Sequence, residues 1–113
     1  MELTTEQRAD GIERIILAGR MDSAGTDQIE MRFTALTATR PARIVVDMAQ
    51  VPFLSSIGIR LLLSNAKALK LRGGRMVIAS PQPMVKDVFE IVGMASLIPV
   101  HADLDSACAA LKT

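Results

Sequence analysis

The sequence predicts a single α/β domain: a mixed, mostly parallel sheet of four to five strands with about four helices and an N-terminal β-hairpin. Three observations support this fold class. Short β-branched runs alternate with longer segments whose apolar residues recur at helical spacing. The strands near the middle of the chain are continuously apolar, as in a parallel sheet covered on one or both faces. The 113 residues contain no Pro/Gly-rich linker, so we expect one domain over residues 1–113.

The hairpin is predicted from the first residues of the chain. Residues 3–9 form a rather polar strand and residues 12–18 a more apolar one. Asp10-Gly11 between them is a tight-turn signal. Gly19-Arg20-Met21-Asp22 then breaks the second strand.

Four helices are expected after the hairpin, separated by further strands. The first is capped by Asp22 or Ser23, the second starts near Ser55, and the last is capped by Asp103. The strands between them are expected at residues 44–46 and 76–79 and, at an edge that tolerates proline, at residues 98–100. The inward helical positions are, in order, Ile29, Phe33 and Leu36; Gly58, Leu61, Leu62, Asn65 or Ala66, and Leu69; Val85, Val88, Phe89 and Val92; and Leu104, Ala107, Cys108 and Leu111.

Three loops follow the carboxyl ends of predicted strands, at residues 19–23, 47–56 and 80–83. Such loops form the usual functional edge of a parallel sheet. We therefore expect these loops to converge.

A pair of serines marks the most informative of these loops. An apolar run ends on Asp47, and Ser55 and Ser56 stand where an amphipathic helix begins. One serine is enough to cap a helix, and Gly58 costs up to about 1 kcal/mol relative to alanine. Its missing side chain would let a partner's backbone or a neighbouring loop approach. If Ser55 is the N-cap, Ser56 is displayed to solvent, and we favour this arrangement.

Three segments resemble the STAS domain family, in particular the bacterial anti-sigma factor antagonists. They are Gly19-Arg20-Met21-Asp22, Val46-Asp47 and Val51-Pro52-Phe53-Leu54-Ser55-Ser56-Ile57-Gly58-Ile59. The antagonists carry a Gly-x-Leu-Asp turn, a strand ending in Asp, and a loop that reads hydrophobic-Asp-Ser-Ser/Thr-Gly-Leu. The resemblance extends over essentially the whole chain in length and in order of elements.

The resemblance implies a regulatory protein that is not an enzyme and needs no cofactor. The unphosphorylated form would bind an anti-sigma factor that is also a serine kinase of the histidine-kinase-like ATPase type, which frees a sigma factor or equivalent partner. Phosphorylation would abolish binding and a serine phosphatase would restore it. Carried over, the acceptor is Ser56, Gly58 matches the family glycine, and Asp22 and Asp47 match the flanking acids.

Two positions depart from the family pattern. Ser55 stands where the antagonists usually have Asp, and Ile57 stands where they have a second Ser or Thr. The change at Ser55 removes a negative charge beside the acceptor and creates a second candidate hydroxyl. Phe53 or Ile57, if exposed, would supply the apolar anchor of the interface, although either could equally belong to the core. The expected partner-binding residues are Asp22, Asp47, Phe53, Ser55, Ser56, Ile57 and Gly58.

Composition excludes several other classes of function. The formal net charge of +1 and the 3% aromatic content argue against a nucleic-acid partner. Apolar runs of only a few residues predict no membrane insertion, and a single cysteine without a signal peptide predicts a protein of the reducing cytoplasm. His101 has no second ligand at metal-binding spacing and Cys108 lies on an apolar helical face, so we expect no metal site and no thiol nucleophile.

Two alternatives to the antagonist role belong to other classes. A stand-alone STAS subunit of a membrane transporter or lipid-transport ATPase would use the same helix as a docking surface without phosphorylation. A small hydrolase or nucleotide-binding enzyme would need a nucleophile elbow or a glycine-rich phosphate loop, and the sequence contains neither.

Overall fold

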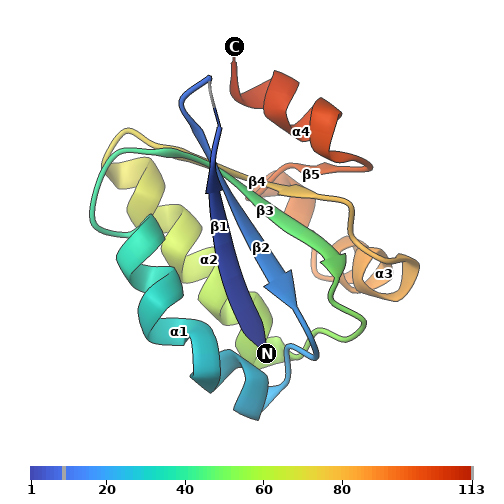
Figure 1. Cartoon of the computed structure of the whole chain (residues 1–113). Helices are drawn as coiled ribbons and strands as arrows, with labels where there is room; N and C mark the ends of the chain where they lie inside the picture. The colour runs from blue at the N-terminus through green and yellow to red at the C-terminus, as the bar shows by residue number, and fades with distance from the viewer. Residues whose placement is uncertain (9, 113) are drawn as a thin grey trace.

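Five strands form one mixed sheet in which the spatial order of the strands is their order in the chain (Figure 1). The structure is a computed structural model that describes residues 1–8 and 10–112. The strands are β1 (Glu2–Gln7), β2 (Ile12–Ala18), β3 (Arg43–Gln50), β4 (Arg75–Ala79) and β5 (Val100–His101).

The N-terminal hairpin and the parallel strands occur as expected. β1 pairs with β2 in antiparallel register, while β2, β3, β4 and β5 are parallel to their neighbours. β1 ends at Gln7, two residues before the end of the expected strand at residues 3–9. Ala9, the last residue of that expected strand, lies outside the described residues.

Helices cover both faces of the sheet. They are α1 (Ser23–Thr37), α2 (Ser56–Leu71), α3 (Pro83–Ile91) and α4 (Leu104–Leu111), with a short 3-10 turn at Met94–Ser96. α1, α2 and α3 contribute side chains to the larger core on one face, and α4 closes a smaller core on the other. α1 and α2 run side by side along their face (Figure 1). The fold class expected from the sequence is confirmed.

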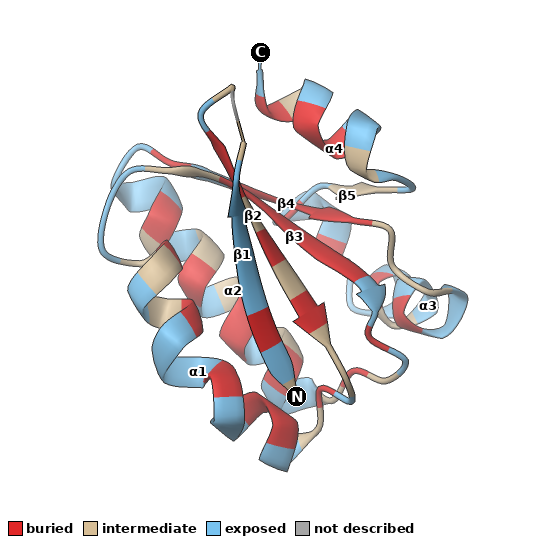
Figure 2. Cartoon of the chain, viewed as in Figure 1, coloured by how far each residue is buried: buried red, intermediate tan, exposed pale blue. Residues whose placement is uncertain are grey.

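β3 is buried from Ile44 to Met48, because both of its faces are covered there. Ile44, Val46 and Met48 face the larger core, whereas Val45 faces the smaller one. Figure 2 shows the contrast with β1, which is exposed along most of its length. This burial explains why the sequence of β3 is continuously apolar and not alternating.

Two expectations near the C-terminus are wrong. The last strand is Val100–His101, not residues 98–100, because Ile98 belongs to the core and Pro99 has no N–H to donate to a strand. Val92 is 49% exposed, because α3 ends one residue before it and Val92 is the C-cap.

The structure also decides which residue of α2 faces the core near its centre. Asn65 is buried and Ala66 is only half-buried. The Asn65 side-chain oxygen accepts a hydrogen bond from Thr37 Oγ1 at 2.9 Å, and its amide donates to the carbonyl of Leu61 at 2.9 Å. Thr37 Oγ1 also lies 2.8 Å from the carbonyl oxygen of Phe33, so its one proton is shared between the two acceptors. This buried polar pair ties α1 to α2.

Candidate functional site

The turn after β2 and the loop after β3 are joined by main-chain hydrogen bonds. The N–H of Met21 donates to the carbonyl of Phe53 at 2.9 Å, and the carbonyl of Met21 accepts from the N–H of Ser55 at 3.0 Å. Met21 and Leu54 form a parallel bridge and are both buried. The position at which α2 begins is therefore fixed from outside the helix.

Ser55 is the N-cap of α2, as favoured from the sequence. Its Oγ accepts from the N–H of Gly58 at 3.3 Å and donates to the carbonyl of Met21 at 2.8 Å. Ser55 is half-buried, and its hydroxyl is used both as donor and as acceptor. The Ser55 side chain therefore holds the loop after β3 against the turn at Met21.

Ser56 is the first residue of α2 and is exposed. Within the described part of the chain its hydroxyl has no hydrogen-bond partner. α2 also carries no acidic residue in its first turn. Free N–H groups and the positive end of the helix dipole are thus left for an anion at this position.

Gly58 allows the turn at Met21 and the side chain of Leu54 to pack closely against the start of α2. A Cβ at this position would lie 2.8 Å from Leu54 Cδ1, 2.8 Å from Met21 Cγ and 3.2 Å from the Met21 carbonyl oxygen. Of the two explanations that the sequence left open, the neighbouring loop is the one that the packing supplies. Gly58 is buried, so any contribution to a partner is indirect.

α1 begins close to the same turn and is capped by Asp22. The Asp22 carboxylate accepts from the N–H of Gly25 at 2.8 Å. Arg20 Nε lies 3.6 Å from Asp22 Oδ2, and the Arg20 guanidinium stacks over the Phe53 ring, 4.3 Å from its centroid. Phe53 is half-buried, with this cation on one face of its ring.

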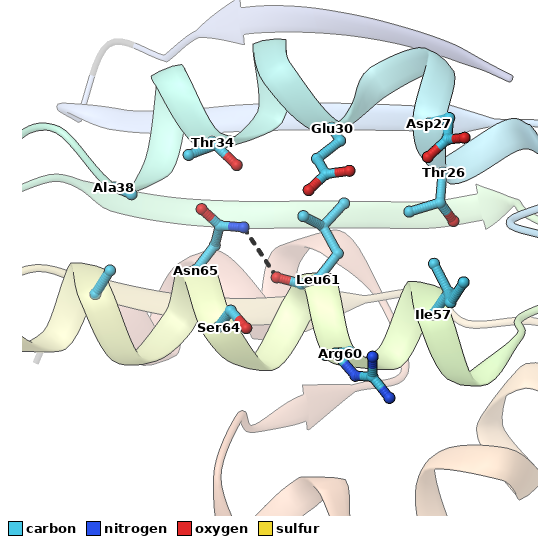
Figure 3. A pocket seen from close by; sticks show the side chains of 11 residues that line it. Thr26, Asp27, Glu30, Thr34, Ala38, Ile57, Arg60, Leu61, Ser64 and Asn65 are labelled. Atoms are coloured by element: carbon cyan, nitrogen blue, oxygen red, sulfur yellow. Dashed lines mark hydrogen bonds between the residues drawn. The ribbon is translucent and has the colours of Figure 1, made fainter. Parts of the chain in front are cut away.

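Ile57 is the exposed apolar residue of the site. It is 41% exposed and lies at one end of a groove of about 480 Å³ between α1 and α2. In Figure 3, Glu30 and Asp27 project from α1 on one side of the groove, and Ile57 projects from α2. Ser56 directly precedes Ile57 in the first turn of α2, and both residues are exposed, although only Ile57 lines the groove.

Asp47 is not part of this surface. β3 continues through Asp47 to Gln50, so the expectation that the strand ends on this carboxylate is wrong. Asp47 alternates with Val46 and Met48, which face the core under α1 and α2, and its side chain therefore lies on the opposite face of the sheet. The structure does not bring it together with the serines.

The Asp47 carboxylate has a structural partner on that face. It is 5% exposed, and Asp47 Oδ2 accepts from Arg14 Nη2 at 2.6 Å. Asp47 Oδ1 accepts from the N–H of Ala49 at 3.0 Å. The hydrogen bond to Asp47 raises the pKa of the Arg14 guanidinium, against the opposing effect of burial. An ion pair between Arg14 and Asp47 thus joins β2 to β3.

The loop after β4 reaches the same edge of the sheet. Gln82 Nε2 donates to the carbonyl of Ala49, near the end of β3, at 2.9 Å. The three loops expected to converge therefore do so. In the described part of the chain no group of three or more His, Cys, Asp or Glu side chains is placed to hold a metal ion.

Three residues of this region were not identified from the sequence. Arg20 covers Phe53, and Gly25 allows the turn to pack against α1, since a Cβ there would lie 2.1 Å from the Arg20 carbonyl oxygen. Arg60 is the nearest cation along α2, four residues after Ser56. Only Arg60 has a signal in the sequence, because residues at i and i+4 of a helix are neighbours. Side-chain stacking and close backbone approach have no such signal.

The sequence of this chain is similar to those of a known protein family. The family model of the STAS domain matches residues 6–107. The protein named "Putative anti-sigma factor antagonist BtrV" of Bordetella bronchiseptica is 35% identical over all of this chain and 97% of its own length.

Solved structures show the same fold. SpoIIAA in its unphosphorylated form has a TM-score of 0.79 at 21% identity, over 98% of this chain and 96% of that one. The phosphorylated form of the Bacillus protein SpoIIAA has a TM-score of 0.70 at 22% identity, over 96% of this chain and 97% of that one.

The same fold occurs within a membrane protein. The murine anion transporter Slc26a9 matches 90% of this chain with a TM-score of 0.77 at 14% identity, over 18% of its own length. In contrast to a whole transporter, this chain has no helix among its described residues with the length and apolar content to span a bilayer. The fold, the family model and the identity to a full-length relative agree, and the chain belongs to the STAS domain family.

Proposed function

We propose that this chain is a cytoplasmic anti-sigma factor antagonist, a binding module and not an enzyme, that docks onto its anti-sigma factor through the start of α2. Phosphorylation of Ser56 by that partner, a serine kinase of the histidine-kinase-like ATPase type, ends the complex, and a serine phosphatase restores it. The observation that carries the proposal is an exposed Ser56 hydroxyl at the first position of a capped helix, beside exposed Ile57. The name of the Bordetella relative and the existence of phosphorylated SpoIIAA support it.

The hydrogen bonds favour Ser56 over Ser55 as the acceptor. Ser55 Oγ holds the Met21 carbonyl and the Gly58 N–H, so its modification would break the cap and the junction between the loops. Ser56 is exposed and its modification breaks no hydrogen bond given by the described residues. A kinase can therefore reach Ser56 without unfolding the first turn.

The charge of a phosphate explains how the modification would act on binding and not on folding. Phosphoserine carries roughly −1.5 to −2 charges at neutral pH. At the start of α2 the helix dipole favours such a charge by about 0.3–1 kcal/mol. A partner surface that packs against the neutral hydroxyl and against Ile57 would have to desolvate the dianion or meet it with like charge. The fold should tolerate the phosphate, whereas the complex should not.

The docking surface that we propose is centred on Ser56 and Ile57 and continues into the groove between α1 and α2. Ile57 supplies the apolar anchor, and Asp27 and Glu30 give one wall of the groove a negative charge. Phe53 contributes less, because Arg20 covers one face of its ring. Asp22 acts indirectly, by capping α1.

The first test is an affinity pull-down from the organism's lysate with wild type, Ser56→Asp and Ser23→Asp, followed by mass spectrometry. Ser23 is also exposed and is the first residue of α1, so Ser23→Asp is a matched control for added charge. We expect wild type and Ser23→Asp to retain a histidine-kinase-like ATPase and Ser56→Asp to lose it. Retention by all three proteins would contradict the proposed switch.

The second test is phosphate incorporation from ATP by the purified partner. Wild type and Ser23→Ala should be labelled stoichiometrically and Ser56→Ala should not, with phosphopeptide mapping to confirm the position. Equal labelling of Ser56→Ala and wild type would remove the acceptor assignment. Stable co-purification with a transporter or lipid-transport ATPase, without labelling, would instead identify the chain as a stand-alone regulatory subunit of the kind suggested by the fold of Slc26a9.

A further inference from the structure

The Arg60 side chain on α2 makes no ion pair and no hydrogen bond with the described residues. Among the described residues, every arginine except Arg60 and Arg72 has a carboxylate or main-chain carbonyl partner. Arg72 is the C-cap of α2, where the helix dipole favours a positive charge. Arg60 lies in the second turn of the same helix, beyond the first turn where the dipole acts most strongly. Arg60 therefore has no carboxylate or carbonyl partner among the described residues.

The surroundings of Arg60 offer no carboxylate in reach. α2 has no Asp or Glu along its length. Glu30, on the facing helix, points toward α2, whereas the Arg60 guanidinium extends away from α1 and in the direction of the helix start (Figure 3). No ion pair joins Glu30 to Arg60 in the described structure. The Arg60 guanidinium therefore has no ion-pair partner among the described residues and extends toward the end of α2 at which Ile57 lies (Figure 3).

Helix geometry makes Ser56 and Arg60 neighbours. Residues at i and i+4 lie on one face, and Cα–Cβ bonds tilt toward the helix N-terminus, so the long Arg60 side chain leans back over the preceding turn. An anion that precedes a cation by four residues is the favourable orientation for a pair on a helix. A guanidinium can also donate two parallel hydrogen bonds to phosphate oxygens.

We propose that Arg60 is the intramolecular partner of the phosphate on Ser56 and holds that phosphate against the first turns of α2. This inference rests on the proposed phosphorylation of Ser56 and adds how the modified state is organised. Arg60 acts as a positioning residue: it stabilises the dianion where it would meet a docking partner. The phosphorylated chain should therefore remain folded, with its phosphate fixed in place.

α1 provides the contrasting case within the same protein. Ser23 occupies the first position of α1 as Ser56 does in α2, and both are exposed. The residue four positions after Ser23 is Asp27, and the preceding N-cap is Asp22. A phosphate on Ser23 would thus meet two carboxylates at a helix start that is otherwise built in the same way. A comparison of phosphates at Ser23 and Ser56 therefore measures the effect of neighbouring charge, because the helix dipole acts on both positions alike.

The test uses the full chain with phosphoserine inserted during translation at position 56, or at position 23 as control, so that no kinase is required. The second pKa of each phosphoserine, ordinarily about 6, is measured by ³¹P NMR titration. A cation beside the phosphate favours the dianion and lowers this pKa, and a carboxylate raises it. We expect the pKa at position 56 to be lower than at position 23 by about 0.5 unit or more.

Arg60→Gln should raise the pKa of phosphoserine 56 by about 0.15–0.4 unit, and the difference from the parent should shrink as salt is added. Arg72→Gln removes the same charge from the far end of α2 and should leave the titration unchanged. Arg60→Lys keeps the charge without the planar fork and should restore part of the lowering.

An unchanged titration in Arg60→Gln, or equal shifts in Arg60→Gln and Arg72→Gln, would overturn the role of Arg60. All three substitutions are at exposed positions, and circular dichroism of each protein verifies its fold. The outcome is independent of the proposed function. A chain that shows the expected pKa values and is never labelled by its partner would retain the Arg60 pairing and lose the kinase switch.

Discussion

The starts of α1 and α2 are built alike. Each helix has a polar N-cap, an exposed serine at its first position and a buried glycine at its third. Each cap accepts a hydrogen bond from that glycine, Asp22 from Gly25 and Ser55 from Gly58. Both glycines pack against the turn at Arg20 and Met21, so one short segment sets the position of both helices.

The two starts differ in charge. At α1 the Asp22 carboxylate already occupies the positive end of the dipole, and Asp27 follows in the next turn. At α2 the cap is a neutral serine, no acid occupies the first turn, and Arg60 follows. The positive end of the dipole is thus already paired with a carboxylate in α1, whereas in α2 it has no negative charge beside it. The comparison teaches that two helix starts with the same backbone arrangement differ in how well they would accept an added anion, because the charges of their neighbouring residues differ.

The largest expected effect compares the two glycines. In Gly25→Ala the new Cβ would lie 2.1 Å from a backbone oxygen, whereas in Gly58→Ala the closest atoms belong to the side chains of Leu54 and Met21. We expect urea unfolding to show a loss of about 3 kcal/mol in the free energy of unfolding for Gly25→Ala and about 1 kcal/mol for Gly58→Ala.

A control for helix propensity is available in the same chain. Ala24→Gly changes propensity by about 1 kcal/mol at an exposed position of α1, without a new contact. If Gly25→Ala were as stable as wild type, the close approach of the Arg20 carbonyl would not be a constraint on the start of α1.

An intermediate effect is expected from removing each cap. Asp22→Ala should lower the free energy of unfolding by about 2 kcal/mol and Ser55→Ala by about 1 kcal/mol. The hydrogen bond from Gly25 to the Asp22 carboxylate is charge-assisted and 2.8 Å long, and that from Gly58 to Ser55 is neutral and 3.3 Å long. Chemical denaturation at low and high salt measures both; only Asp22→Ala should become less damaging with salt. The opposite order would show that α2 depends more on its cap.

The smallest effect concerns added negative charge at the first helical positions. Ser56→Asp should be neutral or stabilising by up to about 0.5 kcal/mol, because it meets the helix dipole and Arg60. Ser23→Asp meets the same dipole but also the carboxylates of Asp22 and Asp27, so it should be less favourable than Ser56→Asp by about 0.5 kcal/mol. Thermal unfolding at low ionic strength detects the sign of each. Equal shifts in the two variants would remove the electrostatic distinction between the helices.

Much of the site could be predicted from the order of residue types. Ser55 as cap and Ser56 as displayed serine follow from the start of an amphipathic pattern, and the convergence of three loops follows from a parallel sheet. Asp47 could not be placed in this way, because its environment depends on the pairing of β3 with β2, which brings Arg14 beside it. The resemblance to the family motif suggested that Asp47 lies near Ser55 and Ser56. The alternation of side chains along β3 instead puts Asp47 on the opposite face of the sheet.

The sequence by itself determined the α/β fold class, the helix starts and the candidate serine, because periodicity, caps and glycines act within a few residues. Tertiary structure alone decided that Gly58 accommodates the Met21 turn, that Arg20 covers Phe53 and that Ile57 is exposed beside Ser56. These features depend on which surfaces meet after the chain has folded. Packing between segments distant in the sequence therefore selects which motif residues remain available to a partner.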